Sequence, residues 1–479
     1  MRWTLNLLRE APAARCLDGS PGAFYLRPPA TGNSTNNRFV IFLEGGGWCL
    51  SPADCVARSY SKYGSSLSYK EGASAPGSSS GYFDPPGGSH LGREFADATL
   101  VFVKYCDASS FAGNGAVTLR AKKTLLLGGG RRVKPGGSFQ VPHAGRAILG
   151  ATLDALIARF ALGSATEVLL SGCSAGGLAA LLAAEFVRER VRAAGAAASL
   201  TRFKVLVFSG VFHASAQPKF GHVWRDQMGN WSAMANVHAS LGRTCKDRWP
   251  GQPWRCVLGL EPLLAVPADV PVFLEQSVLD RWQTGCILGA AAGAFEMIGC
   301  SAKSDAWDSC LQFMNPLVPS ARASSARRAS GRQLPARSCG LEQRRALDGF
   351  QGEFAAALVD SAALRRPGYG AFLHACHSHC PGNPRRIALG AANLEAAMLS
   401  WWRAAPDVPS ADHLHVSCLP GWAALDEQLV SVERRLKSGA DAKKACRAVC
   451  PPLYPWPDGR RMIRARAATV AAALELPPS

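Results

Sequence analysis

One short segment of the sequence has the residue types and spacing of an activated nucleophile. Residues 172–176 read Gly-Cys-Ser-Ala-Gly, a G-x-S-x-G pattern centred on Ser174. An apolar run at 168–171 precedes it and a run of Gly, Leu and Ala at 177–182 follows, so a strand, a sharp turn and a helix are predicted. In such a nucleophile elbow, small flanking residues avoid clashes and the turn lifts the serine hydroxyl above the sheet edge. The pattern predicts Ser174 as the nucleophile of an acyl-transfer enzyme; the alternative is a tight turn with an unreactive serine.

A glycine run after an early strand would supply the second part of such a site. The strand predicted at 39–43 ends in Glu-Gly-Gly-Gly-Trp at 44–48. Backbone N–H groups without side chains can approach a substrate oxygen, as the second oxyanion donor of α/β-hydrolases does. The N–H of Ala175, at the start of the helix after the elbow, can point at the same oxygen. A glycine run alone equally fits a flexible turn, but together with the elbow it favours an oxyanion hole.

A serine hydroxyl needs a base, and the base needs an acid that orients it. In α/β-hydrolases the chain order is Ser, then Asp or Glu, then His. Asp280 follows a strand predicted at 271–276, and the C-terminal ends of parallel strands form the active edge of such a sheet. We therefore expect Asp280 to be the acid; the alternative is a surface carboxylate paired with Arg281. The base must come from the histidines further along: His374, His377, His379, His413 and His415.

Three of these histidines lie in one cluster with two cysteines. Residues 374–380 read His-Ala-Cys-His-Ser-His-Cys. Histidine and cysteine are the usual ligands of zinc, so the cluster fits a metal site. It also fits a disulfide-braced loop that presents one histidine to the serine. The spacing alone leaves both interpretations open.

The elements that must position these residues follow an α/β pattern. Short apolar runs alternate with longer helical patterns, and near-continuous runs of Val, Ile, Leu and Phe are typical of parallel strands covered on both faces. We predict strands at 39–43, 100–104, 168–171, 204–208 and 270–274, and helices at 146–162, 177–194 and 347–359. Long loops rich in Gly, Pro and Ser separate them.

Charge and composition narrow the class of partner. The chain of 479 residues has 53 Lys and Arg against 35 Asp and Glu, a net charge of +18. Such a field attracts anionic polysaccharide, nucleic acid or anionic membrane, although a solvated basic surface has the same composition. No nucleic-acid-binding motif and no transmembrane span is visible in the sequence. Residues 318–338 are dominated by Ser, Ala and Arg and are predicted to be a disordered basic insertion.

The cysteine content points to oxidising conditions. The 16 cysteines are an even number, and no pair has the C-x-x-C spacing of a redox or metal motif. Asn33 and Asn230 begin triplets that fit the N-glycosylation pattern. The apolar stretch at 5–8 is too short for a secretory leader, so we expect that a secreted form would have its leader outside this chain.

Several strings of the sequence, taken together, resemble the pectin acetylesterase and Notum family. They lie at 16–21, 43–49, 105–111, 172–177, 280–283 and 376–380, and the similarity runs from about Cys16 to Cys450. The triple glycine before Trp48, and Cys173 before the predicted nucleophile, are closer to the plant-like pectin acetylesterases than to Notum.

The resemblance assigns roles that the pattern alone leaves open. It implies a triad of Ser174, Asp280 and His379, because His379 matches the family's histidine directly before a cysteine. His377 stands where the family usually has an apolar or aromatic residue, and as a second histidine of the same loop it is the competing base. It further implies disulfides rather than zinc at the cysteines of the cluster. The resemblance also implies an oxyanion hole formed by the backbone N–H groups of Gly46, Gly47 and Ala175. Trp48 would line the acyl pocket. The disulfide-bonded cysteines of the cluster would be Cys376 and Cys380.

We therefore expect an α/β-hydrolase-like catalytic domain at 16–455, with a mostly parallel central sheet and helices on both faces. Residues 1–15 would be an extension or leader remnant, and 456–479 a tail. The expected activity is a secreted, monomeric, cofactor-free and metal-free serine esterase of the extracellular space or cell wall, removing O-acetyl groups from a polysaccharide such as pectin. The alternatives are a Notum-like carboxylesterase that removes a longer acyl group from a lipidated protein, a non-catalytic polysaccharide-binding protein, and a zinc protein built on 374–380.

Overall fold

The computed structural model describes residues 3–29, 37–71, 82–83, 90–130, 132–214, 218–288, 341–381, 384–389, 392–416, 448–449, 470 and 472–475. The predicted basic insertion at 318–338, the acceptor Asn33 and most of the predicted tail lie outside the described residues.

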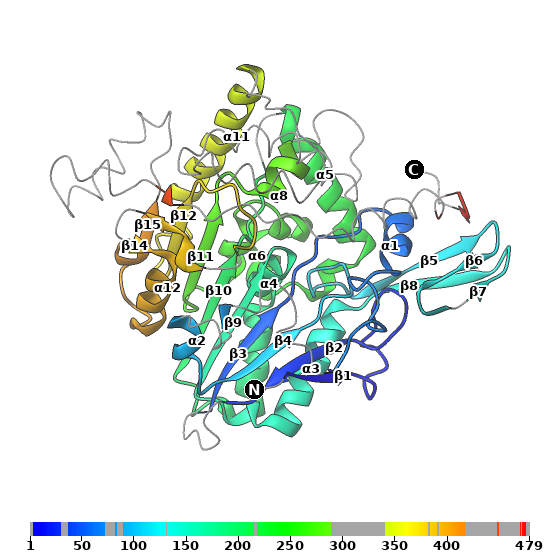
Figure 1. Ribbon diagram of the computed structural model, residues 1–479, viewed down its shortest axis with the longest axis horizontal. Coiled ribbons are helices and arrows are strands. Elements are labelled where there is room, and N and C mark those ends of the chain that lie inside the picture. Colours follow the sequence, from blue (N-terminus) through cyan, green and yellow to red (C-terminus); the bar gives the residue numbers. More distant parts are fainter. Residues whose placement is uncertain are drawn as a thin grey trace, which may run out of the picture.

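A nine-stranded sheet forms the centre of the molecule (Figure 1). Its strands are β1 (Thr4–Leu7), β2 (Ala23–Arg27), β3 (Arg38–Leu43), β4 (Thr99–Val103), β9 (Glu167–Cys173), β10 (Arg202–Phe208), β11 (Val272–Ser277), β12 (Gly370–His374) and β15 (Leu414–Val416). They are ordered β1-β2-β4-β3-β9-β10-β11-β12-β15. All pairs from β4 to β15 are parallel, whereas β2 is antiparallel to both of its neighbours. The predicted mostly parallel α/β sheet is confirmed.

Helices cover both faces of this sheet because its strands are apolar on both sides. In β9, Val168 and Leu170 pack into the same core as α3 (Gly145–Phe160) and α4 (Ala175–Val191). Leu169 points the other way, into a second core that includes α12 (Leu394–Arg403). Successive side chains of a strand point to opposite faces, so a continuous apolar run serves two cores at once.

The parallel strands bring four distant chain segments to one edge. The glycine run follows β3, Ser174 follows β9, Asp280 follows β11 and the histidine cluster begins at the end of β12. Parallel strands all end on the same side, which is where α/β sheets place their ligands. The topology therefore gathers all the predicted site segments.

Several element boundaries differ from the sequence-based prediction for local reasons. Strand β9 continues to Cys173 instead of ending at 171, because Cys173 still pairs with Phe208 of β10. Helix α4 begins at Ala175, two residues earlier than expected, because Ser174 has a positive φ of 60° that ends the extended backbone. Strand β11 is shifted toward its C-terminal end, where Ser277 pairs with His374.

A β-arm, defined as residues 115–143, projects from one side of the body (Figure 1). It is built from β5 (Gly115–Ala121) paired with β8 (Ser138–His143), and β6 (Leu125–Leu126) paired with β7 (Arg132–Val133). A strand from the predicted tail, β17 (Leu474–Glu475), adds to the free side of β5.

The remaining regular elements are short segments and outer helices. The helices are α1 (Pro52–Arg58), α2 (His90–Glu94), α5 (Pro218–Met234), α6 (Arg243–Arg248), α7 (Glu261–Ala265), α8 (Arg281–Gln283) and α11 (Leu341–Val359), and the strands are β13 (Ala388–Leu389), β14 (Ala392–Asn393) and β16 (Ala448–Val449). In the part of the chain that the structure describes, no helix combines the length and apolarity needed to cross a membrane.

Replacing Leu170 by Ala should destabilise the fold strongly. Leu170 is fully buried in β9, between β3 and β10, so its removal leaves a cavity at the centre of the sheet. We expect a loss of about 2–5 kcal/mol in the free energy of unfolding, measured by denaturant titration. The control Leu126→Ala, on the arm at 53% exposure, should change stability little. Equal losses in both variants would contradict the assignment of β9 to the core.

Candidate active site

Ser174 occupies a sharp turn that requires glycine two positions before it and two positions after it. Its backbone has φ 60° and ψ −130°, a conformation that non-glycine residues adopt rarely. A Cβ on Gly172 would lie 2.2 Å from the carbonyl oxygen of Gly176, and one on Gly176 would lie 2.1 Å from that of Leu43. A Cβ on Gly45, across the edge, would lie 2.1 Å from a carbonyl oxygen of the same turn. The predicted elbow is therefore present, and it is packed backbone to backbone against the glycine run.

A continuous hydrogen-bonded chain joins Ser174, His379 and Asp280. Nε2 of His379 lies 2.8 Å from Oγ of Ser174, and Nδ1 lies 2.7 Å from Oδ2 of Asp280. Asp280 is completely buried, and its second oxygen accepts the N–H of Gln283 at 2.9 Å. The carboxylate beside Nδ1 holds the proton there in neutral imidazole, which leaves Nε2 free to accept the serine proton.

The competing histidines lie elsewhere. Nδ1 of His377 lies 3.1 Å from the carbonyl oxygen of Leu279, so this ring is bonded to the backbone just before Asp280. His374 lies in the strand and pairs with a different carboxylate, as described below. The structure therefore brings His379, of the histidines in the cluster, to the serine.

A disulfide ties the serine and histidine segments together. Cys173, directly before Ser174, is bonded to Cys380, directly after His379, across a sequence separation of 207 residues. Cys376 is also disulfide-bonded. Because a zinc ligand must be a free thiolate, neither cysteine of the cluster can bind zinc in this state. A second Cys–His group, Cys49, Cys55 and His143, is likewise occupied by a disulfide, between its two cysteines.

A second buried imidazole–carboxylate pair supports the histidine loop, defined as residues 375–380. Nε2 of His374 lies 2.7 Å from Glu275 Oε1, with both side chains completely buried. His374 Nδ1 accepts the N–H of Cys376 at 3.2 Å, so the neutral ring donates from Nε2 to Glu275. The other Glu275 oxygen accepts the N–H of Ser209 at 3.1 Å, and Ser209 Oγ accepts the N–H of Cys380 at 3.1 Å. One end of the histidine loop is thus bonded to His374 of β12, which pairs with β11, and the other end is bonded to Ser209, the residue after β10.

The glycine run is held by donors to its carbonyl groups. Arg58 donates to the carbonyl oxygens of Gly46 and Trp48, and the hydroxyl of Tyr105 donates to that of Gly47 at 2.8 Å. These bonds fix the orientation of the peptide planes. Among the described residues, no acceptor pairs with the N–H groups of Gly46, Gly47 or Ala175. Three N–H groups of the described chain therefore remain available to bind an external oxygen.

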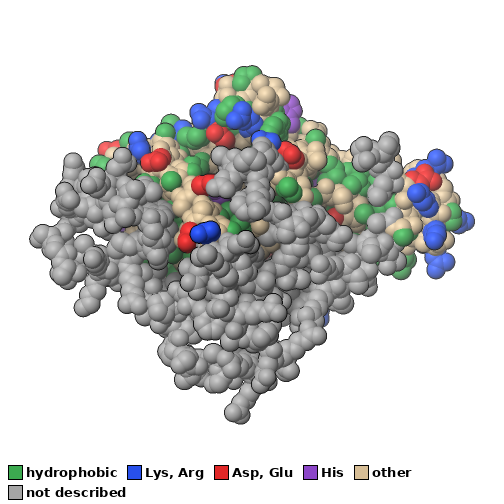
Figure 2. Space-filling model, turned by 90° about the horizontal axis from the view of Figure 1, so that it is seen from above, with side chains coloured by type: hydrophobic (Ala, Val, Ile, Leu, Met, Phe, Trp, Pro, Cys, Tyr) green, Lys and Arg blue, Asp and Glu red, His purple; other side chains and the backbone are tan. Residues whose placement is uncertain are grey.

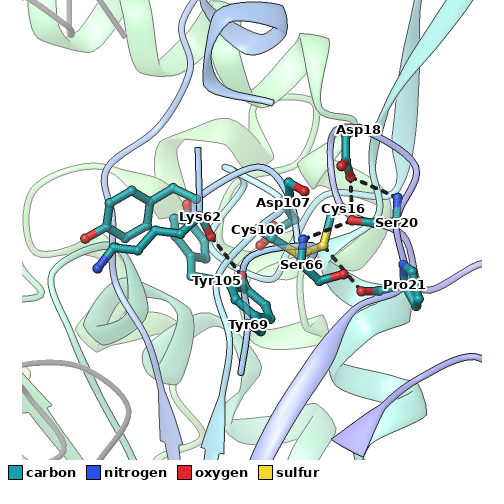
Figure 3. Close-up of a disulfide and its surroundings, with 12 residues drawn as sticks. Cys16, Asp18, Ser20, Pro21, Lys62, Ser66, Tyr69, Tyr105, Cys106 and Asp107 are labelled. Carbon is teal, nitrogen blue, oxygen red and sulfur yellow. Dashed lines mark hydrogen bonds between the residues drawn. A yellow bond between two sulfur atoms is a disulfide. The ribbon is translucent and has the colours of Figure 1, made fainter. Parts of the chain in front are cut away.

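The loop that carries Tyr105 is itself rigidly anchored. The adjacent Cys106 forms a disulfide with Cys16, and the surrounding turn is closed by bonds from Ser20 to Asp18 (Figure 3). The next residue, Asp107, is buried and accepts the N–H groups of Ser109 at 3.0 Å and Phe111 at 3.3 Å. Burial raises the pKa of Asp107 to about 6, while these hydrogen bonds act in the opposite direction.

Trp48 lies in an aromatic cluster that reaches the histidine. Its ring is fully buried, its indole N–H donates to Ser110 Oγ at 2.8 Å, and its centroid is 5.7 Å from that of Trp282. The Trp282 ring is in turn 6.2 Å from the His379 ring. Three more rings complete the cluster around Trp48: Phe212, Trp224 and Trp231.

Sequence reasoning missed the residues that support the site. Tyr105 and the cysteines at 173 and 380 stood in strings that resemble the family, but no role was expected for the tyrosine, and a disulfide was expected at Cys380 without its partner. Arg58, Glu275 and Ser209 had no sequence signal, because each acts through a contact with a residue 12 or more positions away in the chain.

Removing the Cys173–Cys380 disulfide should disconnect the serine from its base. In a Cys173→Ser, Cys380→Ser double variant we expect a loss of about 2–5 kcal/mol in stability, because the bond closes a long loop. Hydrolysis of p-nitrophenyl acetate should fall about tenfold or more, since small displacements of a base are costly.

The matched control removes the Cys245–Cys256 disulfide, which closes a separation of only 11 residues near α6. Its hydrolysis rate should stay near that of the parent protein. If both double variants lose activity equally, the disulfide has no special role in holding the histidine loop.

Comparisons with known proteins agree with the architecture and with the strings noted in the sequence. The pectinacetylesterase family profile matches residues 1–394. Pectin acetylesterase 5 of Arabidopsis thaliana is 25% identical over 378 residues, which cover 78% of this chain and 72% of the relative. Pectin acetylesterase 7 of the same plant is 26% identical over 374 residues, 78% of each chain. The palmitoleoyl-protein carboxylesterase NOTUM of Schmidtea mediterranea is 26% identical over 279 residues, 56% of this chain and 47% of the relative. The chain therefore belongs to the pectinacetylesterase family, a family of carboxylic ester hydrolases.

Proposed function

We propose that this protein hydrolyses carboxylic esters with Ser174 as nucleophile, His379 as general base and acid, and Asp280 as the acid that orients the histidine. One observation carries the proposal: the unbroken chain from Ser174 Oγ through both nitrogens of His379 to a completely buried carboxylate. Nucleophile, base and orienting group within hydrogen-bonding distance are the geometric signature of this chemistry.

The reaction proceeds through an acyl-enzyme. His379 Nε2 takes the proton of Ser174 as Oγ attacks the ester carbonyl, and Asp280 stabilises the imidazolium that forms. The N–H groups of Gly46, Gly47 and Ala175 bind the oxyanion of the tetrahedral intermediate. His379 then protonates the departing alcohol. A water molecule, deprotonated by His379, attacks the acyl group and releases the carboxylic acid and the free serine. None of these steps requires a metal ion or an organic cofactor.

The proposed substrate is an O-acetylated cell-wall polysaccharide such as pectin. Two similar Arabidopsis proteins are named pectin acetylesterases, and the net charge of +18 favours an acidic polymer. In this scheme Trp48 forms the wall of the acyl site through its contact with Trp282, which lies beside His379.

A secreted, monomeric protein of the extracellular space or cell wall fits this substrate. Four disulfides are formed between described cysteines, as expected where conditions are oxidising. The side chain of Asn230, in one predicted glycosylation triplet, is exposed on α5.

A second candidate function is the removal of a longer acyl group from a lipidated protein. The observation that favours it is the large buried aromatic cluster from Trp48 to Trp282, which makes the surroundings of His379 apolar. Similarity to a protein named as a palmitoleoyl-protein carboxylesterase points the same way, although over a smaller part of the chain.

Replacing Ser174 by Ala should abolish ester turnover. Without the nucleophile, we expect the rate of p-nitrophenyl acetate hydrolysis to fall by about 10³-fold or more. The matched control is Ser171→Ala, a buried serine of β9 three residues earlier, which should keep its turnover. Turnover that survives Ser174→Ala would contradict the assignment. A wild-type protein that binds pectin but hydrolyses no ester would favour a binding protein instead.

The preferred acyl group can be tested by varying the length of the acyl chain in the ester substrate. We expect kcat/KM to be higher for p-nitrophenyl acetate than for p-nitrophenyl octanoate, because an acetylesterase site need only accommodate two carbons. Each methylene that finds an apolar pocket contributes about 0.8 kcal/mol of binding. A strong preference for octanoate would therefore replace the acetyl hypothesis by the long-chain alternative.

A further inference from the structure

The β-arm holds a concentration of positive charge that the proposed chemistry does not use. Residues 115–143 contain six Lys and Arg and no Asp or Glu. Five of these cations are described by the structure, and all five are exposed: Arg120, Lys122, Lys123, Arg132 and Lys134. Figure 2 shows Lys and Arg side chains gathered on the projection formed by the arm.

The arm separates its apolar and cationic side chains onto different faces. Along β5, Leu119 and Ala121 are buried whereas Arg120 between them is exposed. On β7, Val133 is buried and Arg132 is exposed, directly opposite Leu126 of β6. Arg120 and Arg132 lie on β5 and β7, and Lys122, Lys123 and Lys134 directly follow these strands, so the five exposed cations are spread over the outer surface of the arm.

Within the described part of the chain, the five arm cations lack the carboxylate partners that other cations have. Arg38, for comparison, forms ion pairs with Glu94, Asp97 and Glu167. Among the described residues, no ion pair involves any of the five arm cations. The closest acidic group in the sheet is Glu475 of β17, which stands opposite Arg120. A single carboxylate can offset only one of the five positive charges, so the surface of the arm keeps a positive electrostatic potential.

The inner face of the arm packs against the helix that follows the glycine run. Leu119 and Phe139 share a core with Cys55 and Val56 of α1, the helix that follows the glycine run. At the base of the arm, Nε2 of His143 lies 3.7 Å from Sγ of Cys55. Arg58, at the end of the same helix, donates to the glycine run. The arm is therefore built onto the helix that supports the proposed oxyanion hole.

We infer that the arm is a docking surface for a linear anionic polysaccharide, whose carboxylates pair with the exposed cations of the arm while an ester of the same chain reaches Ser174. This deepens the proposed function, on which the choice of occupant rests. A single-stranded nucleic acid would be expected to find exposed aromatic rings on which its bases stack, and the one aromatic residue of the arm, Phe139, is buried. A membrane would require an apolar face, and Leu126 is the one large apolar side chain exposed on the described part of the arm.

The test compares two variants that each lose five positive charges. The arm variant carries Gln at Arg120, Lys122, Lys123, Arg132 and Lys134. The control variant carries Gln at five exposed cations outside the arm: Arg9, Arg192, Arg243, Lys246 and Arg365. Binding of de-esterified polygalacturonate is measured by light scattering or calorimetry at about 0.02 M and about 0.5 M NaCl, a range over which screening changes strongly.

The arm variant should bind polygalacturonate about tenfold or more weakly at low salt, with the difference from wild type shrinking at high salt. Its KM for acetylated pectin should rise, while turnover of the neutral ester p-nitrophenyl acetate should stay unchanged in both variants. The control variant should keep most of the affinity for the polymer.

Three results would overturn the inference. Equal loss of binding in both variants would show that only net charge matters. Unchanged binding by the arm variant would place the polymer elsewhere. Loss of binding to duplex DNA or to anionic phospholipid vesicles, with polygalacturonate binding retained, would assign the arm to that partner instead. A protein that binds polygalacturonate through the arm but hydrolyses no ester would refute the proposed function while leaving the arm inference intact.

Discussion

At the elbow, backbone lies directly against backbone, and the rest of the site depends on that contact. Gly172 and Gly176 close the turn around Ser174, and Gly45 faces it from the end of β3 with no room for a side chain. Such close approach brings the start of the glycine run at Gly45 against the backbone of Cys173 and the Cβ of Ser174 without any intervening side chain. A rigid arrangement of this kind lets donors be in place before charge develops on a substrate oxygen, which is where electrostatic catalysis gains most.

Two further constraints fix the base against this elbow. The Cys173–Cys380 bond joins the neighbours of Ser174 and His379, and the Glu275–His374 pair bonds both ends of the histidine loop to the sheet. Burying charged groups is expensive unless each is hydrogen-bonded, and here the polar atoms that face the loop have partners. Hydrogen bonds and a disulfide therefore fix the position of the histidine loop, whereas the apolar cores on either side of the sheet supply most of the stability of the fold.

The sequence predicted the parts of the site that depend on local pattern. The elbow at Ser174, the glycine run after β3 and Asp280 after β11 each followed from residue types next to an apolar strand. The choice of His379 over His377 did not follow from spacing, because two residues of separation give no information about which ring faces a serine more than 200 positions earlier. That choice came from the family resemblance; in the structure the ring of His379 lies within hydrogen-bonding distance of Ser174, and that of His377 is bonded to the backbone. The disulfide partner of Cys173 and the support from Tyr105 depend on contacts between distant segments, and Arg58 acts across 12 positions of the chain; none of these contacts leaves a local signal.

The central claim is that Ser174 is a nucleophile made reactive by His379, and covalent capture tests it most directly. The wild-type protein is treated with a fluorophosphonate ester, which reacts with activated serines, and the modified peptide is identified by mass spectrometry. The account predicts a single adduct on Ser174 that forms with loss of esterase activity, and that is strongly reduced in His379→Ala. An adduct on another residue that accompanies inactivation, or equally rapid labelling of Ser174 without His379, would contradict it.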